Sequence, residues 1–495
     1  MSKHGMNSLG IEVIEIFLLN KMINTNRCLI ILSISLFLSI VVVCFSYSTI
    51  YAQEQQEQEQ QNEPQNINGI ILSDPNLKLE LVTSGLDFPT TMAFLDQDDF
   101  LILEKSGTVK RVVDGHLLDK PLLQIDVSEK DERGLLGIAV NEKQENNSNS
   151  SIIPSQNKDI SHNLFLYYII CEEKNGDCKN QIYRYDLDNK NNVLVNPKLL
   201  LSIPSFPDPA HIGGIIDIGP DNNLYFTVGN FENTVPDEPY KTKTQNFEDG
   251  EAVDGRAGIL RITQDGEPVD SAGEGILGNE YPLNLYYAYG VKNSFGIDFD
   301  PVTGKLWLTE NGPRFGDEIN LAEPGFNSGS DKIFGIWKVN DEGKKLKADV
   351  DDNVEDEYIT VTEDSPSDLV YFNGKGHYSP PEFTWDKSVA PTALLFLDSD
   401  KLSSQYQNDM FVGSVDGGRI FHFDLNENRT ELLLKGVLED KIASDSTEYN
   451  DILFAEGFSI ITDIKQGPDG YLYIVSGLKQ SKTEKPGAVY RILPS

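Results

Sequence analysis

The sequence predicts an all-β protein, a six-bladed β-propeller built from four-stranded antiparallel blades. One pattern recurs along the chain: a turn with Asp, Asn or Gly precedes an alternating strand, and a second strand of the loose form Gly-x-apolar-x-Arg/His-apolar follows a variable loop. Patterns typical of helices are few. Six such units can be recognised, at 98–113, 162–187, 221–230 with 258–263, 303–321, 408–425 and 469–492.

Spacing and closure support a ring of these units. They are spaced roughly 60 to 105 residues apart, longer than compact propeller repeats, so we expect large loops. A strand predicted at 77–85 would complete the last blade beside 490–492, and a closed ring leaves no long exposed sheet edge. Two β-sandwich domains are the alternative, but they do not explain why one pattern runs from 98 to 492.

Composition limits the partners that the protein can bind. The chain has 495 residues, with 41 Lys and Arg against 78 Asp and Glu, for a formal net charge of −37. Such a charge repels nucleic acid and anionic membranes, so neither is expected as a partner. The charge also suits a soluble protein in a cation-rich medium, where surface calcium is plausible; solubility alone is the simpler interpretation.

The N-terminal region predicts export. Residues 28–51 form the one long apolar stretch, basic residues precede it, and Ala52 follows it. We therefore predict a signal peptide or N-terminal anchor over 1–52, with cleavage near Ala52 favoured and Met22 a candidate for the true start. The protein would be secreted or extracytoplasmic, and an uncleaved anchor would be its link to a membrane.

The residues after this segment predict where the folded part begins. Residues 53–66 are dominated by Gln and Glu and cannot build a hydrophobic core. We predict a disordered spacer over 53–76 and a single propeller over 77–495. Residues 142–160 are polar and are expected to form a surface insertion.

Two of the four cysteines lie in the apolar N-terminal stretch, and Cys171 and Cys178 remain. Export permits their oxidation, and Asn175-Gly176 between them is typical of a tight turn. The expected role is a local disulfide that closes a hairpin. Metal binding would need two more soft ligands, and none are nearby in the sequence.

Two polar clusters fall just outside predicted inner strands, where propellers build ligand sites at the channel mouth. His211 precedes Gly213-Gly214 and a strand, and could accept a proton from a substrate hydroxyl near neutral pH. Lys292 and Asn293 lie between a Tyr-rich strand and the next strand, where a Lys could hold an anionic group. Taken alone, a lone His is more often structural, and a loop Lys is more often simply solvated.

The third cluster follows the strand at 305–309. Gly312 and Pro313 form a corner whose carbonyl oxygens, with neighbouring polar groups, suit a hard cation such as Ca²⁺. No EF-hand spacing is present. Asp317 and Glu318 could instead make contacts within the blade, so the residues alone leave the metal site open.

Taken in this order, the clusters resemble the soluble quinoprotein glucose/sorbosone dehydrogenase family, which includes the aldose sugar dehydrogenases. The resemblance covers nearly all of the chain after residue 77, and its pieces are specific only in combination. The matching segments are 85–112, 133–140, 211–230, 290–301, 310–325, 390–397 and 467–477.

The resemblance implies a six-bladed propeller that binds pyrroloquinoline quinone (PQQ) and Ca²⁺ and oxidises the anomeric C–OH of sugars. It implies that His211 is the general base that removes the hydroxyl proton while hydride passes to the quinone. It implies that the carbonyls of Gly312 and Pro313 hold the Ca²⁺. Lys292 and Asn293 fall where the family usually has Arg-Asn, and the resemblance implies that both bind the cofactor.

Several positions depart from the family pattern. Lys292 keeps the charge of Arg but loses its planar fork. The family often has a Gln before the Gly-Leu-Leu that begins at Gly134, where this chain has Asp131-Glu132-Arg133. Asp416 falls where a basic residue holds the cofactor, and an Arg-x-Arg pair is absent from 459–462. Because PQQ is a tricarboxylate, loss of three charge-assisted contacts would weaken its binding by roughly three or more decades unless other cations replace them.

The sequence therefore predicts an exported PQQ-dependent sugar dehydrogenase that uses Ca²⁺, acts on a small-molecule sugar and passes electrons to an acceptor that the sequence does not identify. One alternative is a non-catalytic propeller that lost the quinone and binds glycan or protein. Another is a calcium-dependent lactonase-type hydrolase, for which Glu310 and Asp317 are the candidate ion ligands.

Overall fold

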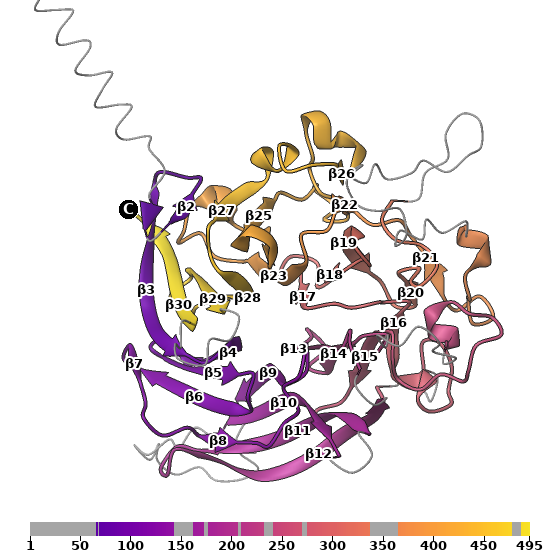
Figure 1. Ribbon diagram of the computed structural model, residues 1–495, viewed down its shortest axis with the longest axis horizontal. Coiled ribbons are helices and arrows are strands. Elements are labelled where there is room, and N and C mark those ends of the chain that lie inside the picture. Colours follow the sequence, from indigo (N-terminus) through magenta and orange to yellow (C-terminus); the bar gives the residue numbers. More distant parts are fainter. Residues whose placement is uncertain are drawn as a thin grey trace, which may run out of the picture. The chain divides into compact units, whose positions relative to one another are not determined.

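In the computed structural model, the strands described below lie within residues 65–495 (Figure 1). The predicted signal or anchor lies outside the described residues, as does nearly all of the 142–160 insertion. No helix in the described part of the chain is long and apolar enough to cross a membrane. The described residues are 66–67, 69–142, 162–172, 177–205, 209–231, 241–269, 275–336, 365–477 and 487–495.

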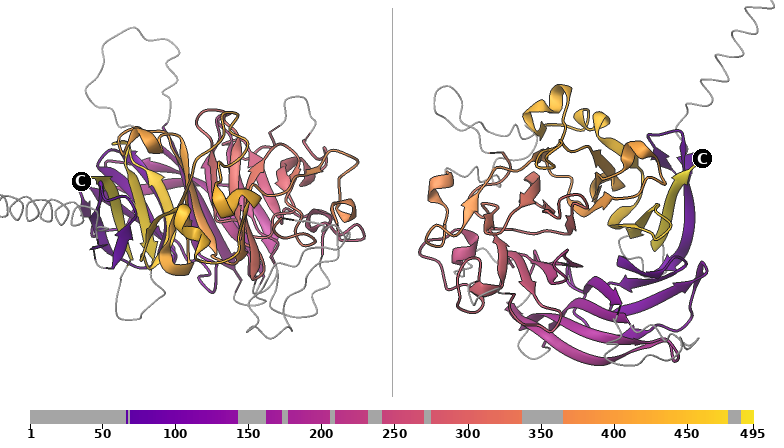
Figure 2. Two further views of the ribbon diagram at one scale, coloured as in Figure 1. Left: turned by 90° about the horizontal axis from the view of Figure 1, so that it is seen from above. Right: turned by 180° about the vertical axis from the view of Figure 1, so that it is seen from behind.

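The described strands form six sheets set around a common centre, which confirms the predicted all-β propeller (Figure 1). Seen from above, the strands run roughly along the axis of the ring (Figure 2). The strands at the inner edges of the sheets are β4 (Pro89–Asp96), β9 (Leu135–Glu142), β13 (Gly213–Ile218), β17 (Gly296–Phe299), β23 (Pro391–Leu397) and β28 (Ile460–Gln466).

From these inner strands each sheet extends outward. The first adds β5 (Asp99–Glu104), β6 (Thr108–Val113), β7 (His116–Leu117) and β8 (Leu123–Gln124); the second β10 (His162–Cys171), β11 (Cys178–Asp188) and β12 (Val193–Ser205); the third β14 (Leu224–Val228), β15 (Gly258–Ile262), β16 (Tyr286–Tyr289), β20 (Phe326–Asn327) and β21 (His377–Tyr378). The fourth adds β18 (Leu306–Glu310), β19 (Phe315–Ala322), β22 (Phe383–Lys387) and β26 (Ile442–Ala443); the fifth β24 (Asp409–Ser414), β25 (Ile420–Phe423), β27 (Leu453–Glu456), β2 (Ile70–Leu72) and β1 (Asn66–Ile67); the sixth β29 (Leu472–Gly477), β30 (Gly487–Pro494) and β3 (Leu77–Leu86).

Helical structure in these residues is limited to short 3-10 turns. They are η1 (Lys243–Gln245), η2 (Leu283–Leu285), η4 (Pro366–Asp368), η5 (Ser404–Tyr406), η6 (Asp416–Gly418), η7 (Gly436–Asp440) and η8 (Glu448–Asp451).

The sheets differ from uniform four-stranded antiparallel blades. They contain four to six strands. Three outer pairings are parallel: β16 with β20, β20 with β21, and β22 with β26. The added strands are two-residue segments taken from long loops, and they cover sheet edges that would otherwise present unpaired backbone groups.

The ring is closed by β3, as predicted for the strand at 77–85. Strand β3 pairs antiparallel with β30, with Leu79 opposite Ile492 and Glu80 opposite Arg491. Arg491 reinforces the pairing through an ion pair with Glu80 at 2.6 Å. The last sheet therefore combines the two ends of the folded chain.

The end of the predicted spacer is ordered as strand. Ile70 and Leu72 in β2 are 4% and 1% exposed, and β2 pairs with β27 at the outer edge of the fifth sheet. Burial of these two apolar side chains overrides the polar composition that precedes them.

Cys171 and Cys178 form the predicted disulfide, which joins the end of β10 to the start of β11. The two residues are paired directly across the strands, so the bridge closes the hairpin locally. Asn175-Gly176 lies outside the described residues.

The hydrophobic core lies between neighbouring sheets. One cluster joins Met92 and Ile102 of the first sheet to Val475 and Val489 of the sixth. Strand β14 is buried at all five positions, because its two faces pack against different neighbouring sheets. This packing fixes the inner strands, and with them the loops at the mouth of the central channel.

Candidate functional site

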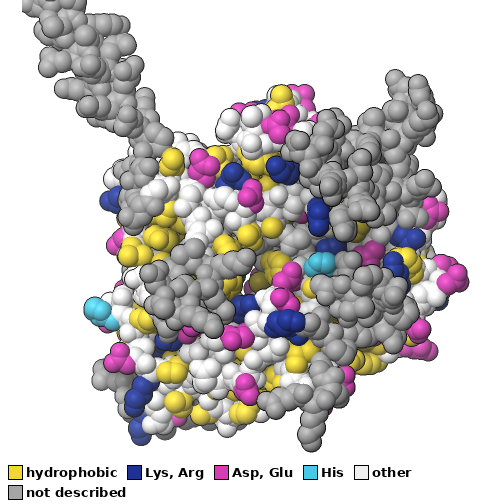
Figure 3. Space-filling model, viewed as in Figure 1, with side chains coloured by type: hydrophobic (Ala, Val, Ile, Leu, Met, Phe, Trp, Pro, Cys, Tyr) yellow, Lys and Arg dark blue, Asp and Glu magenta, His cyan; other side chains and the backbone are white. Residues whose placement is uncertain are grey.

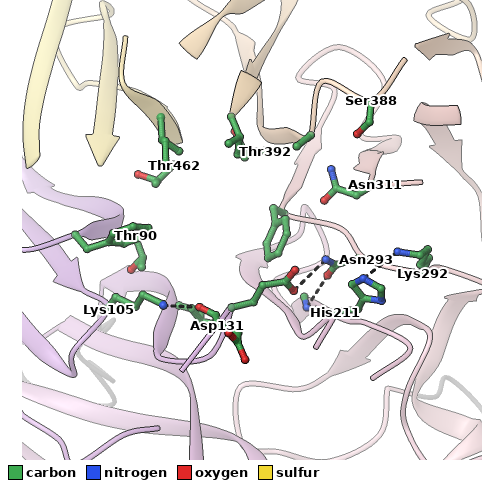
Figure 4. Close-up of a pocket in the computed structure, with 18 of the residues that line it drawn as sticks. Thr90, Lys105, Asp131, His211, Lys292, Asn293, Asn311, Ser388, Thr392 and Thr462 are labelled. Atoms are coloured by element: carbon green, nitrogen blue, oxygen red, sulfur yellow. Dashed lines mark hydrogen bonds between the residues drawn. The ribbon is translucent and has the colours of Figure 1, made fainter. Parts of the chain in front are cut away.

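A cavity of about 380 Å³ lies where the inner strands β13, β17 and β28 begin. On the face shown in Figure 3, acidic and basic side chains gather around the hollow at the centre of the ring. Figure 4 shows the side chains that converge on the cavity from several sheets. Its lining residues include Phe88, Thr90, Lys105, Asp131, Glu132, Leu136, His211, Lys292, Asn293, Phe295, Asn311, Gly312, Ser388, Thr392, Val415, Ile460 and Thr462.

His211 lies in the cavity wall with both ring nitrogens engaged. Its backbone has a φ of 50°, an uncommon conformation for a non-glycine residue, immediately before β13. Nε2 lies 3.1 Å from Nζ of Lys292, and Nδ1 lies 3.2 Å from Oδ1 of Asn230. A lysine ammonium can only donate, so Nε2 accepts, and the ring proton resides on Nδ1 and is donated to Asn230.

The side-chain amide of Asn230 is oriented by a hydrogen bond to Asp331. This residue is fully buried, and its Nδ2 donates to Oδ1 of Asp331 at 2.9 Å, so its Oδ1 must face His211. Asp331 in turn accepts a hydrogen bond from Gln245 at 3.0 Å. The chain of polar contacts therefore holds the neutral His211 tautomer whose Nε2 can accept a proton.

Lys292 and Asn293 are 3% and 2% exposed, and both line the cavity. The backbone N–H of Lys292 donates to Oε1 of Glu310 at 2.6 Å, which fixes the start of the segment before β17. Asn293 accepts from the N–H of Gly213 at 3.0 Å and donates to Oε2 of Glu132 at 3.1 Å. The Lys292 side chain thus contacts His211. The Asn293 side-chain amide instead bonds Gly213 of the third sheet and Glu132 before the second sheet.

Gly312 reaches the cavity wall, and the exposed Pro313 follows it. A Cβ at position 312 would lie 2.0 Å from the carbonyl oxygen of Phe315, so only glycine fits this corner. The Gly312 N–H donates to Oδ1 of Asp317 at 2.8 Å. The corner proposed for Ca²⁺ is therefore held in one conformation by a buried carboxylate.

Asp317 is fully buried and ties this corner to the fifth sheet. Its Oδ2 accepts hydrogen bonds from Ser388 Oγ and from the N–H groups of Val389 and Ala390, at 2.8, 2.8 and 2.9 Å. Burial raises the pKa of this carboxyl, and the four donors lower it again in part. Both oxygens are occupied by donors, so Asp317 is not aimed at an ion in the channel.

Glu310 and Glu318 form a buried carboxyl pair beneath the cavity, each 3% exposed. Ser328 Oγ donates to Glu310 at 2.5 Å, and Glu318 accepts from the N–H of Gly335 at 2.6 Å. Burial and then the neighbouring Glu318 raise the pKa of Glu310, and burial raises the pKa of Glu318 to about 7. Because Ser328 directly follows β20 of the third sheet, its contacts with these carboxyls join the third and fourth sheets. The sequence had allowed contacts of Glu318 within its own blade.

A sequence profile described as "Glucose / Sorbosone dehydrogenase" matches residues 86–485. The chain belongs to the glucose/sorbosone dehydrogenase family. The resemblance recognised in the sequence is thereby confirmed.

Individual members of the glucose/sorbosone dehydrogenase family are similar to this chain at low identity. Aldose sugar dehydrogenase YliI of Escherichia coli is 24% identical over 423 residues, covering 84% of this chain and 93% of its own. Quinoprotein glucose dehydrogenase B of Acinetobacter calcoaceticus is 24% identical over 466 residues, covering 84% and 89%. The PQQ-bound aldose sugar dehydrogenase of Streptomyces coelicolor superposes with a TM-score of 0.53 at 19% identity, covering 87% and 100%, and supports the fold alone.

This family member has a second lysine in the cavity that the sequence did not single out. Lys105 follows β5, and its Nζ donates to the carbonyl oxygens of Glu129 and Asp131 at 2.9 and 2.5 Å. Burial lowers its pKa, and the Glu129 and Asp131 carboxylates oppose that shift. Its position after a strand of the first sheet, at the same channel mouth as His211, was the available clue.

The cavity wall away from His211 carries hydroxyl groups, with Lys105 beside Thr90 (Figure 4). Thr90, Thr392 and Thr462 line it from three different sheets (Figure 4). Asp416 stands where the family has a basic residue, and Arg419 follows it three positions later. Arg419 donates to the Asp416 carboxylate at 2.9 Å and is not among the lining residues. It therefore does not replace the basic residue missing at position 416.

Proposed function

We propose that this protein is an exported PQQ-dependent sugar dehydrogenase that binds Ca²⁺, with each of its six sheets forming one blade of a six-bladed propeller. The single observation that carries the proposal is the contact of His211 with both Lys292 and Asn230 in the wall of the central cavity. Family membership and the similarity to quinoprotein glucose dehydrogenase B support the same function.

The cavity suits a planar anionic quinone. Its volume of about 380 Å³ lies within the usual range of ligand pockets. Apolar side chains supply surfaces for a flat ring, and two lysines supply charge for carboxylates. Neutral hydroxyls can donate hydrogen bonds to the remaining carboxylate oxygens. The residues that would hold the quinone are Phe88, Thr90, Lys105, Lys292, Phe295, Val415, Ile460 and Thr462.

The carbonyl groups of Gly312 and Pro313 would hold Ca²⁺ at the cavity wall. Carbonyl oxygens are ordinary Ca²⁺ ligands, and a rigid corner lowers the cost of ordering them. Asp317 supplies that rigidity through the Gly312 N–H. Asn311 also lines the cavity beside this corner.

The chemistry assigned to this chain's own residues is proton transfer. PQQ supplies the carbon that accepts hydride when it is bound. Nε2 of His211 removes the hydroxyl proton of the sugar after Lys292 Nζ turns away from it. The Lys292 ammonium then stabilises negative charge developing on the substrate oxygen, and Asn230 Oδ1 stabilises the imidazolium through Nδ1–H.

Two other functions make different use of the same cavity. A non-catalytic glycan- or protein-binding propeller is favoured by the shortage of cations on the hydroxyl wall. A calcium-dependent lactonase would need carboxylates aimed at a channel ion, but Glu310 and Asp317 accept hydrogen bonds from neighbouring backbone groups. The geometry therefore supports the lactonase least.

Reconstitution tests the proposal directly. Purified protein with Ca²⁺ and PQQ should bind the cofactor in the micromolar range and reduce a redox dye when aldoses are added. His211→Ala should abolish turnover with little change in PQQ affinity, whereas His116→Ala, on an exposed residue of β7, should be as active as the unsubstituted protein. Absence of PQQ binding would refute the dehydrogenase function.

Export needs an experiment of its own. Mass spectrometry of protein recovered from outside the cytoplasm should find a mature N-terminus near residue 53 if the signal is cleaved. An intact N-terminus in the membrane fraction would assign the anchor instead.

A further inference from the structure

A second cluster of metal-ligating side chains lies in the fifth sheet, outside the central cavity. It consists of Asp409 in β24, His422 in β25 and Asp424 just after β25. One ligand atom of each residue lies within 4.8 Å of the others. Nε2 of His422 is 2.9 Å from Oδ2 of Asp409 and 3.6 Å from Oδ1 of Asp424.

The strand register explains why these groups converge. Phe411 pairs with His422 and Met410 with Phe423, so the same antiparallel register places Asp409 opposite Asp424. Like charges directly opposite on neighbouring strands destabilise a sheet. This arrangement needs a positive partner between the carboxylates.

Basic side chains supply little positive charge to the Asp409 and Asp424 carboxylates. In the described residues, His422 is the one basic side chain that forms an ion pair with Asp409 or Asp424. The rings of Phe411 and Tyr406 lie 5.1 and 5.2 Å from the His422 ring and hold it in place. A protonated His422 or a bound cation can therefore complete the cluster.

The cluster is open to ions from solvent. His422 lines two surface cavities of about 370 and 330 Å³, and Asp424 lines the second. Asp451 lines both cavities, and Lys435 lines the second. The Asp424 side chain is 44% exposed, so it can adjust toward an ion, whereas Asp409 is held at 12%.

We propose that Asp409, His422 and Asp424 bind one divalent transition-metal ion of the Zn²⁺ type. One imidazole nitrogen and two carboxylate oxygens are a ligand set suited to such ions, with water from the cavities completing the coordination. Ligand atoms about 2.1 Å from Zn²⁺ in a tetrahedral site are about 3.4 Å apart, so the observed 2.9 and 3.6 Å require small adjustments. The ion would cross-link β24 to β25, and this site does not depend on the proposed dehydrogenase activity.

Metal binding to the intact, chelator-treated protein tests this site. Isothermal titration with ZnCl₂ near pH 7.5 should give one equivalent bound at micromolar or lower Kd. His422→Gln and Asp424→Asn should each weaken binding at least tenfold, while His116→Gln and His211→Ala should retain the full equivalent. Co²⁺ should give visible absorption bands that His422→Gln removes.

Two results would overturn the proposal. One is failure of the folded protein to bind Zn²⁺ or Co²⁺ stoichiometrically, which would assign the cluster to a protonated His422. The other is unchanged binding in both variants, which would place the ion elsewhere. Because Asp424 is half exposed, its Asn variant should fold, and circular dichroism checks this before titration.

Discussion

Replacement of Asp317 by Asn tests whether one buried carboxylate holds the proposed Ca²⁺ corner. The carboxylate accepts four hydrogen bonds, one from the Gly312 N–H and three from residues 388–390. An Asn side chain has one acceptor oxygen. If that oxygen keeps the three contacts to 388–390, its NH₂ group must face the Gly312 N–H, so a donor meets a donor.

The magnitude follows from these contacts. Loss of one charge-assisted hydrogen bond costs about 1.5–3 kcal/mol, and the other three weaken because the acceptor becomes neutral. An amide is less costly to bury than a carboxylate, which offsets part of this loss. We expect the free energy of unfolding to fall by about 2–4 kcal/mol. We also expect the Ca²⁺ concentration that supports PQQ binding to rise at least tenfold.

Denaturant unfolding and Ca²⁺ titration of PQQ absorbance measure the two effects. Ser388→Ala is the matched control, because it removes one hydrogen bond and leaves the carboxylate with its three N–H donors. It should cost about 1 kcal/mol and leave the Ca²⁺ dependence nearly unchanged. An Asp317→Asn protein with unaltered stability would show that the carboxylate does not fix Gly312.

Three further predictions concern other contacts. Burial raises the folded-state pKa of Glu318 to about 7 from 4.5, so the free energy of unfolding should fall by about 3 kcal/mol as pH rises from 4.5 through 7. Glu318→Gln should flatten this profile when unfolding is measured at pH 5 and pH 8. Lys292→Met should lower kcat at least tenfold by removing the cation beside His211 while Lys292→Arg retains more activity; equal rates for both variants would exclude a role for the charge. Replacing Cys171 and Cys178 together by Ser should raise KM more than it lowers kcat. The reason is that both sulfurs contact the Arg133 guanidinium, which follows the cavity-lining residues Asp131 and Glu132. An unchanged KM in steady-state assays would contradict this.

The sequence predicted the repeated strands and the closure of the ring because both depend on local alternation of apolar residues. Strand β3 shows this directly, since buried and exposed residues alternate over 77–80 where it pairs with β30. It could not predict β20, β21 or β26, because two-residue strands have no periodicity and form only after the larger sheets are in place. The same limit applies to β2, which is strand because two apolar side chains find a partner in β27.

At the site, the sequence placed His211 and Lys292 at the channel mouth but not in contact. Their separation of 81 positions is bridged only when the third and fourth sheets pack side by side. Lys105 was missed because a lysine after a strand is usually solvated, and its burial depends on loop carbonyls that the pattern does not reveal. The buried state of Glu310 likewise follows from packing, since nothing in the sequence distinguishes it from a surface carboxylate.

Closure of the ring has a temporal consequence for biosynthesis. Strand β3 ends at Leu86 and its partner β30 begins at Gly487, 401 positions later in the chain. At about 5–20 residues per second, synthesis leaves β3 waiting roughly 20–80 s for its partner. Throughout that interval β3 lacks its partner strand, although Leu77 and Leu79 are buried in the folded protein. The β3 edge is therefore open to non-native strand pairing until β30 has been synthesised.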